Sequence, residues 1–415
     1  MTASLSPGLR PAFSLTSFGS SIWPLASRET TASMVVWGRT GPLYWRPHTS
    51  GTRRVGTPSL LNLPIFLRNP KIQKGSLTGG QPTQRGLRTW EEIRGLVEEA
   101  RGSRGLEEVL ASIGPSELEE LAERCWSLRL ARFGRELQVF YPWRRFPAIS
   151  ITGHRCELGC KYCRGRYLRG MISAETPGEL IRVCSSLAEK GAEGILISGG
   201  YTREGILPVG PFLEAIRHVK EHFGLRIAIH PGLVGPELAH GLAEAGVDLA
   251  LCEVFGDEET LREAVGLRRH PGDYLASMRA LKEAGLRLAP HICLGIRGGR
   301  LSGELEALRM ARDVGPDVLV LIIFIPTPGT PYGDRSPPDP ADVEKLMALA
   351  RLMLPDVPMA LGCMRPRRGP YREAVEEAAL RMGFNRMALP GKKALELARR
   401  LGLEVVRREV CCALP

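Results

Sequence analysis

The chain of 415 residues contains no run of eighteen apolar residues, so no segment has the length of a transmembrane helix. Its longest apolar run, residues 318–325, has the length of a strand. Asparagine occurs only three times, whereas arginine is abundant, as in proteins from thermophiles or GC-rich genomes. Ten cysteines without a secretory signal indicate a reducing compartment. We therefore expect a cytoplasmic enzyme without a membrane partner.

Acidic residues are nearly absent from the first 90 residues, which contain one acid, Glu29, and eleven Lys or Arg. This segment carries nearly all of the net charge of +11, and residues 1–88 form a basic leader without hydrophobic periodicity. It resembles an organellar transit peptide in composition. A nucleic-acid-binding arm is disfavoured because the basic residues are spread thinly. We favour a start codon assigned too far upstream in a GC-rich prokaryotic gene, and we expect no nucleic-acid partner.

Three cysteines follow one another closely in the middle of the chain, at Cys156, Cys160 and Cys163. Three thiolates on one loop can bind three irons of a 4Fe–4S cluster and leave the fourth iron open. A structural zinc site would need a fourth ligand, and His154 would have to fold back onto its own loop. A disulfide framework fits poorly in a chain of this length. The spacing therefore favours an open, catalytic cluster.

The Cys-x-x-x-Cys-x-x-Cys loop, with Tyr162 before its last cysteine, resembles the radical S-adenosylmethionine (SAM) superfamily. The resemblance implies that the open iron binds the amino and carboxylate groups of SAM. One electron then cleaves SAM and yields a 5′-deoxyadenosyl radical, which abstracts hydrogen from an unactivated carbon. The protein seats the cofactor, excludes water and directs the radical.

Hydrophobic periodicity predicts an α/β protein with a partial or full (β/α) barrel of the radical SAM type. Helical periodicity from Thr89 onward predicts a helical pre-domain at 89–145, followed by the barrel at 146–392. A C-terminal helix and strand at 393–415 would end in a Cys-Cys tail that folds over the barrel mouth. A doubly wound open sheet is the alternative, disfavoured because no glycine-rich dinucleotide motif follows a strand. The predicted strands are 194–199, 226–230, 247–254, 287–294 and 318–325, with weaker candidates at 357–361 and 386–389. The predicted helices are 177–191, 211–223, 236–246, 272–285, 302–314 and 340–353.

Barrel enzymes collect their chemistry where strands end. The strand at 194–199 leads into Ser198, Gly199 and Gly200, where two glycines would let a ligand approach the backbone. This sequence resembles the superfamily motif that holds the amino group of SAM, although Tyr201 replaces the usual acidic residue. His230 and Glu253 end the next two strands and could contact the cofactor or substrate, or serve as structural polar groups.

Two further strands end in candidate substrate contacts. His291 shares a strand face with Cys293 and could contact substrate if that face points inward. Thr327 and Thr330 lie in the proline- and glycine-rich segment that follows the strand at 318–325. Such a composition predicts a fixed loop over the barrel mouth.

The other cysteines divide into two groups. Cys125, Cys184 and Cys252 lie in apolar segments, which is typical of buried core thiols. Cys363 directly follows a predicted strand, and Cys411 and Cys412 are adjacent near the end of the sequence. If the tail folds back over the barrel, these three could bind a second iron–sulfur cluster. A redox pair and an exposed end without function are the alternatives.

Several motifs together resemble the biotin-synthase-like branch, and within it the archaeal-type two-component lipoyl synthases. The cluster loop and the motifs at 140–142, 290–292, 325–331 and 361–366, with the Cys-Cys tail, carry this resemblance. It implies sulfur insertion into a protein-bound octanoyl chain, with the second cluster as sulfur donor. The implied partners are an octanoylated carrier protein or peptide, a paralogous radical SAM subunit, and a ferredoxin or flavodoxin that supplies electrons. The N-terminal cysteine motif of bacterial lipoyl synthases is absent, because residues 1–124 contain no cysteine.

Other functions remain open from the sequence. Within enzymes, biotin-type sulfur insertion, methylthiolation and cofactor maturation are alternatives, and Cys252 with Cys293 could then bind a cluster inside the barrel. The chain could also be a non-catalytic iron–sulfur scaffold subunit.

Overall fold

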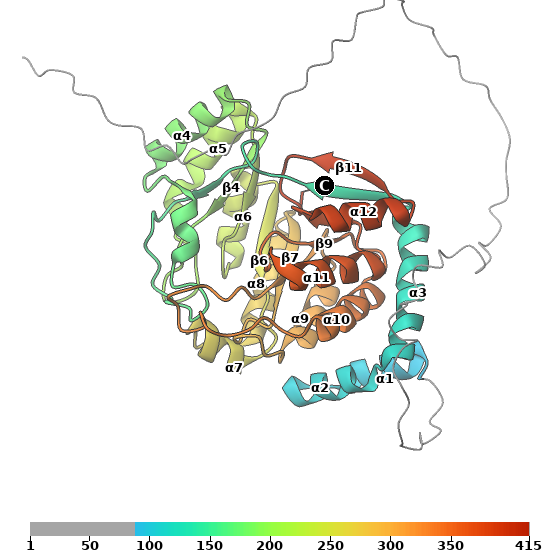
Figure 1. Ribbon diagram of the computed structural model, residues 1–415. Helices are drawn as coiled ribbons and strands as arrows, with labels where there is room; N and C mark the ends of the chain where they lie inside the picture. Colours follow the sequence, from blue (N-terminus) through green and yellow to red (C-terminus); the bar gives the residue numbers. More distant parts are fainter. Residues whose placement is uncertain (1–87, 415) are drawn as a thin grey trace, which may run out of the picture. The chain divides into compact units, whose positions relative to one another are not determined.

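The computed structural model describes residues 88–414, so the predictions for the leader lie, Arg88 excepted, outside the described residues. Its centre is one sheet of eleven strands, and every pair of neighbouring strands is parallel (Figure 1). The strands are β1 (Glu136–Phe140), β2 (Ala148–Ser150), β3 (Ile172–Ser173), β4 (Gly194–Ser198), β5 (Arg226–Ile229), β6 (Leu249–Glu253), β7 (Arg287–Leu294), β8 (Leu319–Ile323), β9 (Met359–Leu361), β10 (Arg386–Ala388) and β11 (Glu404–Arg408).

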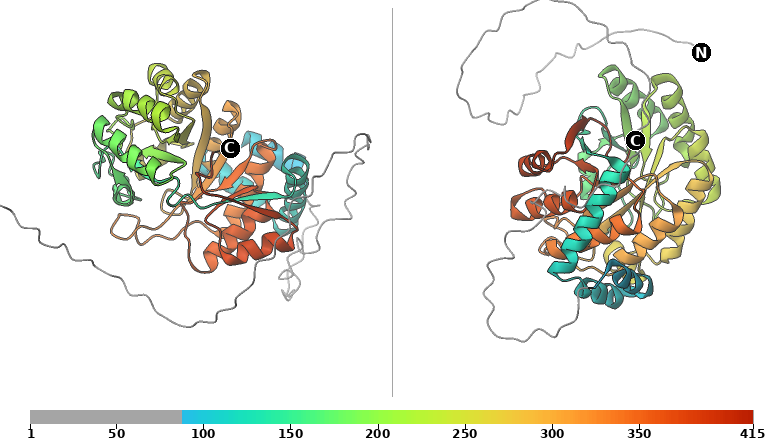
Figure 2. Two further views of the ribbon diagram at one scale, coloured as in Figure 1. Left: turned by 90° about the horizontal axis from the view of Figure 1, so that it is seen from above. Right: turned by 90° about the vertical axis from the view of Figure 1, so that its right-hand side faces the viewer.

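The strand order is β11-β1-β10-β9-β8-β7-β6-β5-β4-β2-β3, and the two edge strands do not pair with each other. From β4 to β10 each strand lies beside the next one in the chain, without the reversal that defines a doubly wound sheet. The sheet curves into a half-barrel with helices on its outside (Figure 2). The structure therefore confirms the predicted partial (β/α) barrel.

Helices alternate with the strands and cover the outer face of the sheet, because parallel neighbours need a crossover connection. No helix within residues 88–414 is long and apolar enough to cross a membrane. The α-helices are α1 (Trp90–Glu99), α2 (Gly102–Ser112), α3 (Pro115–Phe133), α4 (Pro177–Glu189), α5 (Leu213–Phe223), α6 (Pro236–Glu244), α7 (Glu258–Thr260), α8 (Pro271–Glu283), α9 (Glu304–Val314), α10 (Pro340–Met353), α11 (Gly369–Arg381) and α12 (Lys392–Arg400). Three shorter turns of helix are η4 (Arg166–Gly170), η5 (Gly210–Phe212) and the π-helical η6 (Leu261–Val265).

The two faces of the sheet carry different side chains, since successive residues of a strand point to opposite faces. On β5 and β6, Ile229 and Ala250 pack outward into the large core shared with the helices. Ala228, Leu249 and Leu251 point inward and join a second, smaller cluster. The inner face therefore has its own apolar cluster, separate from the core under the helices.

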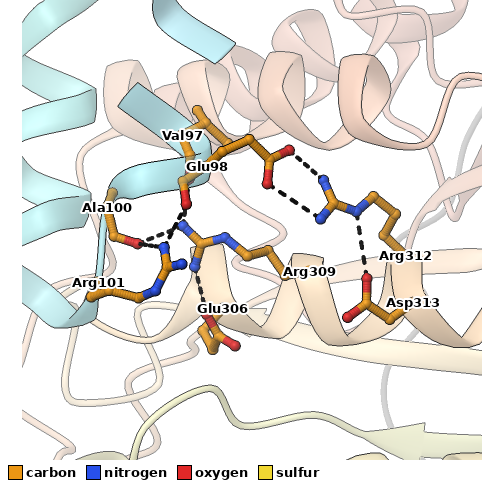
Figure 3. Close-up of polar contacts among 8 residues, drawn as sticks. All are labelled: Val97, Glu98, Ala100, Arg101, Glu306, Arg309, Arg312 and Asp313. Atoms are coloured by element: carbon orange, nitrogen blue, oxygen red, sulfur yellow. Dashed lines mark hydrogen bonds and ion pairs between the residues drawn. The ribbon is translucent and has the colours of Figure 1, made fainter. Parts of the chain in front are cut away.

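The N-terminal helices begin where predicted. Thr89 caps α1 by a capping box with Glu92, in which each side chain bonds the other residue's backbone. On α9, the guanidinium of Arg309 donates to the carbonyl oxygens of Val97 and Ala100 at the end of α1 (Figure 3). A helix leaves its last carbonyls without intrahelical partners, so this arginine satisfies two of them and fastens α1 to the barrel.

The predicted helical pre-domain contains one strand that the sequence analysis did not identify. Helix α3 ends at Phe133, and β1 then inserts between β10 and β11. The segment at 89–145 therefore contributes one strand to the sheet of the barrel.

The C-terminal tail lies on the inner face of the sheet. After β11, residues 410–414 pack into the inner cluster with Ala228, Leu251 and Ala360. The buried guanidinium of Arg386 donates to the carbonyl oxygens of Cys412 (3.2 Å) and Leu414 (2.7 Å). The tail thus lies within the half-barrel rather than only across its mouth.

Candidate functional site

The three cysteines of the central motif lie on the loop between β2 and β3. Cys160 is buried, whereas Cys156 and Cys163 keep partial exposure. The backbone N–H groups of Cys163 and Arg164 both donate to the carbonyl oxygen of Cys160, at 3.2 and 3.0 Å. Gly159 has a φ of 61°, a left-handed conformation that favours glycine. The loop therefore turns back on itself and directs three thiols to one region.

The donor set fits a cluster better than a single ion. In residues 88–414, no three His, Cys, Asp or Glu side chains converge closely enough to hold one metal ion. A 4Fe–4S cluster does not require such convergence, because each thiolate binds a different iron. Thiolates are the ligands that iron–sulfur clusters use, and the loop offers three of them. Cys156, Cys160 and Cys163 are thus the residues that would hold the cluster.

The thiols of Cys160 and Cys163 interact directly. A hydrogen bond between them raises the pKa of Cys160, and burial raises it further. The same hydrogen bond lowers the pKa of Cys163, against the opposing effect of burial. Cys163 is therefore the thiol of this pair that ionises first, and thiolates are the form that binds metal.

The cluster loop is braced from outside through Lys161, between the second and third cysteines. Its N–H donates to the carbonyl oxygen of Ala264 in η6 (2.8 Å), and its carbonyl accepts from the N–H of Tyr332 (3.2 Å). The Lys161 ammonium also lies 5.8 Å from the centre of the Tyr332 ring, within cation–π range. Two segments far away in the sequence therefore hold the middle of the loop.

A buried arginine connects these two segments. Arg297, whose side chain is 2% exposed, forms ion pairs at 2.7 Å with Glu259 and Glu263 on both sides of the α7–η6 junction. The hydroxyl of Tyr332 donates to the other oxygen of Glu263 (3.4 Å). The sequence analysis missed this brace. An arginine followed by two glycines, just after the strand at 287–294, was the available signal.

The glycine pair after β4 contacts the cluster loop rather than an open space. A Cβ atom at Gly200 would lie 1.9 Å from the carbonyl oxygen of Arg155 and 2.6 Å from the Cα atom of Cys156. The N–H of Gly200 donates to the hydroxyl of Thr152 (2.6 Å). Ser198 ends β4, buried on the inner face. Gly200 is therefore required for packing against the loop, and a contact of this glycine pair with SAM stays a prediction.

The neighbouring strand ends form a polar chain on the inner face. The Tyr201 hydroxyl donates to the Glu253 carboxylate at 3.2 Å, and Nδ1 of His230 lies 3.1 Å from the same carboxylate. Burial disfavours the charged form of His230, but the carboxylate outweighs it and the pKa of His230 is raised. Burial likewise opposes ionisation of Glu253, yet His230 keeps the pKa of that carboxyl lowered.

His291 lies beside this chain and differs from it in charge. The rings of His230 and His291 meet edge to face, with centres 5.2 Å apart. Nδ1 of His291 is 3.0 Å from the carbonyl oxygen of Ala289. Burial lowers the pKa of His291 to about 4, and the adjacent His230 contributes to the shift. His291 is therefore neutral at pH 7 and faces inward.

The two threonines of the 325–332 loop are engaged within the protein. The hydroxyl of Thr327 lies 3.0 Å from that of Tyr167 in η4, and Thr330 donates to the carbonyl of Thr327 (2.8 Å). Arg166 donates to the carbonyl of Gly329 (3.2 Å). These contacts fasten the loop to the segment that follows the cluster cysteines, as expected for a fixed loop.

The structure brings Cys363, Cys411 and Cys412 into one neighbourhood. A hydrogen bond from Cys412 lowers the pKa of Cys411 to about 7, and raises that of Cys412. Burial raises the pKa of Cys363, and the nearby Cys411 thiolate contributes. Cys363 is solvent-accessible, whereas Cys412 is buried.

The remaining cysteines are separated by the sheet. Cys125, Cys184 and Cys252 are buried in the outer core, as predicted. Cys252 points to the helices, whereas Cys293 alternates with the inward-facing Ala289 and His291. The alternative of a cluster held jointly by Cys252 and Cys293 is therefore wrong, because the two thiols lie on opposite faces.

Residues 150–310 match the family model of the Radical SAM superfamily. The matched segment contains the cluster loop, the glycine pair, the strand ends that carry His230 and Glu253, and His291 within β7. The chain therefore has a radical SAM domain, and this superfamily implies a 4Fe–4S cluster and SAM as cofactors.

Curated relatives of low identity are biotin synthases. Biotin synthase 2 of Corynebacterium diphtheriae is 24% identical over 223 residues, which cover 51% of this chain and 66% of that protein. The biotin synthase of Marinobacter nauticus is 26% identical over 286 residues, covering 63% of this chain and 78% of the relative. The first of these matches thus spans just under two thirds of the relative's length.

Solved structures share the fold at lower identity. Methylornithine synthase superposes with a TM-score of 0.52 at 20% identity, covering 76% of this chain and 97% of the other. The FeFe-hydrogenase maturase HydG from Carboxydothermus hydrogenoformans gives a TM-score of 0.54 at 16% identity, covering 76% and 79%. Both likenesses concern the fold.

Proposed function

We propose that this protein is a radical SAM enzyme that inserts sulfur into the octanoyl chain of a lipoyl-domain or H-protein, as one subunit of a two-component lipoyl synthase. The observation that carries the proposal is the second group of cysteines, in which Cys363 lies near Cys411 and Cys412 of the tail on the inner face. A single radical-generating cluster needs only one group of three thiols. A second group suits a second cluster, which can donate sulfide.

The chemistry that the bound groups supply is one-electron cleavage of SAM and transfer of sulfide to carbon. In each insertion a C–H bond would be replaced by a C–S bond: the hydrogen atom would leave on 5′-deoxyadenosine, and a second cluster would supply the sulfide and take up the surplus electron. The residues of this chain have separate tasks. Cys156, Cys160 and Cys163 would hold the first cluster, and Gly200 allows their loop to pack closely beside the end of β4.

The closed surroundings of the loop support radical chemistry, which requires that water be kept out. Tyr162 packs against a buried cluster formed by Ala264, Phe324 and Tyr332. The 325–332 loop is tied down through Thr327 and Tyr167. These groups cover one side of the cluster loop with apolar side chains.

The proposed partners follow from this chemistry. The octanoyl chain would arrive on a carrier protein or peptide, and a paralogous radical SAM subunit would share the two insertions. A ferredoxin or flavodoxin would supply one electron for each SAM cleaved.

Mass spectrometry of an octanoylated lipoyl-domain peptide tests the proposal. The protein, reconstituted with iron and sulfide and given SAM and a reductant, should add a sulfur atom to the peptide. The double variant Cys411→Ala/Cys412→Ala should still form 5′-deoxyadenosine but add no sulfur. Cys184→Ala, at a buried core thiol, is the matched control and should keep both activities. A peptide that gains no sulfur, with the paralogue present or absent, refutes the proposal.

Biotin-type sulfur insertion is the second candidate, and the biotin synthase relatives favour it. The same assay with the sulfur-free biotin precursor in place of the peptide distinguishes the two. Sulfur gain by the precursor and not by the peptide would select this alternative.

A further inference from the structure

Strand β11 is an open edge of the sheet. In the part of the chain that the structure describes it pairs only with β1, and Figure 1 shows it at the margin of the ribbon. The opposite edge strand, β3, has only two residues, whereas β11 has five. An edge strand presents a row of unpaired N–H and C=O groups, which is a template for pairing with another chain. β11 is therefore the longer of the two edges at which a further strand could add.

The backbone of β11 shows which of its residues face outward. The N–H of Glu404 donates to the carbonyl oxygen of Arg135 (2.9 Å), and the carbonyl of Arg408 accepts from the residue that follows β1 (2.8 Å). The even-numbered residues of β11 thus bond toward β1. Because backbone groups alternate in direction along a strand, the N–H and C=O groups of Val405 and Arg407 point away from β1. Within residues 88–414 no hydrogen bond reaches these outward groups.

The side chains at the two ends of β11 carry opposite charges. Glu404 and Arg408 are exposed, and neither side chain forms an ion pair or hydrogen bond with another described residue, whereas Arg407 pairs with Glu409 at 3.1 Å. The neighbour of Glu404 on β1 is Glu136, so two carboxylates adjoin at this end. Like charges on adjacent strands are destabilising. A cation placed beside Glu404 would therefore stabilise this end of the strand.

An exposed aromatic residue lies beyond the other end of β11. The N–H of Tyr141 donates to the carbonyl oxygen of Arg408 (2.8 Å), and the chain then enters a turn that contains Trp143. With an exposed fraction of 81%, Trp143 is the most exposed large apolar residue of the described chain. Tryptophan is enriched among the residues that contribute most to protein–protein binding. A strand that ran antiparallel to β11 would begin beside Arg408, close to this turn.

We propose that β11 pairs in antiparallel orientation with β11 of a second copy of this chain, about a two-fold axis at Val406. In the register that uses all the outward groups of the strand, Val405 of one copy exchanges hydrogen bonds with Arg407 of the other. The same register sets Glu404 of each copy opposite Arg408 of the other, while Val406 meets its counterpart. The strand is thus self-complementary in charge, as a two-fold interface requires. The pairing does not depend on the reaction that the protein catalyses.

Sedimentation of the full chain over a wide range of micromolar concentrations tests the pairing. An interface built around one pair of five-residue strands is small, so a reversible dimer is expected whose fraction rises with concentration. Arg408→Glu puts like charges at both ends of the pair and should raise the dissociation constant at least about tenfold. Glu404→Arg should have the same effect. Arg104→Glu, which makes an equal change of charge at an exposed site on α2, is the matched control and should dimerise as the unmodified protein does.

Combining the variants tests the register. The double variant Glu404→Arg/Arg408→Glu exchanges the two charges and should dimerise again. A mixture of the two single variants should form a heterodimer, because every contact at the strand ends then joins opposite charges. Hydrogen exchange of the unmodified protein gives a second measurement: the amides of Val405 and Arg407 should exchange more slowly as the concentration rises.

Each alternative result contradicts a stated part of the proposal. A chain that stays monomeric over the whole range overturns it, and so does a dimer that persists unchanged in both single variants, since association then uses another surface. Dissociation of the single variants without rescue by the double variant or by mixing overturns the antiparallel register. If the variants do not fold, equal exchange of the β11 amides at every concentration overturns the pairing. A chain that is monomeric alone but pairs through β11 with a paralogous subunit replaces the second copy by that partner and overturns the homodimer.

Discussion

Adding one methyl group at Gly200 should displace the cluster loop. A Cβ atom there would lie 1.9 Å from the carbonyl oxygen of Arg155 and 2.6 Å from the Cα atom of Cys156. Real Cβ atoms do not approach other heavy atoms closer than 3.0 Å, and both contacts are backbone atoms that cannot rotate away. The loop that carries the first cysteine must therefore move by about an ångström in Gly200→Ala, judged from the 1.9 Å contact.

The energetic cost follows from comparable substitutions. Forcing extra atoms into a packed site costs about 1–3 kcal/mol, and a backbone clash belongs at the upper end of that range. Unfolding roughly 330 ordered residues at about 2.1 cal/mol/K each gives a melting temperature that falls by about 1.5 °C per kcal/mol. We expect a drop of about 3–5 °C in the cluster-free protein. The iron content after reconstitution should decrease more, in relative terms, than the melting temperature does, because the three thiols must keep their positions relative to one another to bind one cluster.

Two other glycines separate the clash from other effects of the substitution. At Gly178, in the first turn of α4, the nearest atom to a new Cβ is the flexible end of Arg182 at 3.6 Å, so Gly178→Ala should be neutral or slightly stabilising. At Gly159 nothing lies within 4 Å, but φ is 61°, so Gly159→Ala should cost about 1 kcal/mol from backbone strain. Calorimetry and iron analysis of the three variants check the ranking. Gly200→Ala with the iron content and melting temperature of Gly178→Ala would refute the reasoning.

Three further predictions concern other parts of the structure. The pKa of His291 is lowered to about 4, so between pH 6.5 and 4 the unfolded chain binds one proton that the folded chain does not. The free energy of unfolding should therefore decrease as the pH is lowered across that window, by at most about 3 kcal/mol. His291→Gln should flatten this dependence in urea titrations of the cluster-free protein, and an unchanged slope contradicts the prediction. Arg309→Ala removes the donors that hold the end of α1, so limited proteolysis should cut near residues 100–115 sooner, whereas Arg104→Ala, at an exposed ion pair, should behave as the unmodified protein. Arg297→Met should lower the free energy of unfolding by about 1–3 kcal/mol, less than the loss of one partner from a fully buried ion pair, because Glu259 and Glu263 can be hydrated. It should also speed the release of iron to a chelator. Equal release rates would show that Arg297 does not hold the two segments that contact the cluster loop.

The central strands of the barrel could be predicted because they are buried on both faces. A parallel strand covered by helices outside and by side chains inside reads as a continuous apolar run, as Leu319–Ile323 does. Strand β1 escaped detection because its burial alternates over only five residues after a long helix. Its partners β10 and β11 lie some 250 residues further along the chain, and nothing local to Glu136–Phe140 indicates them.

The candidate site divides in the same way. Cys156, Cys160 and Cys163 could be predicted as a group because they lie on one short loop, where the spacing in the sequence alone indicates a shared site. Arg297 was not, because its partners Glu259 and Glu263 are on a different element and only the fold brings them together. The packing of Gly200 against the cluster loop could not be predicted, since the sequence cannot tell whether a ligand or another loop approaches a glycine.

The position of β1 between β10 and β11 has a consequence for biosynthesis. β1 cannot pair until residues 386–408 have left the ribosome, whereas the strands around the first cysteine loop can pair much earlier. Pairings between distant segments are also slow to form, because a large loop must close first. Cys411 and Cys412 lie beyond the last of these segments, so the group that they form with Cys363 can come together only after the loop with the first three cysteines has been made. Iron delivered during synthesis would meet the first group while the second did not yet exist.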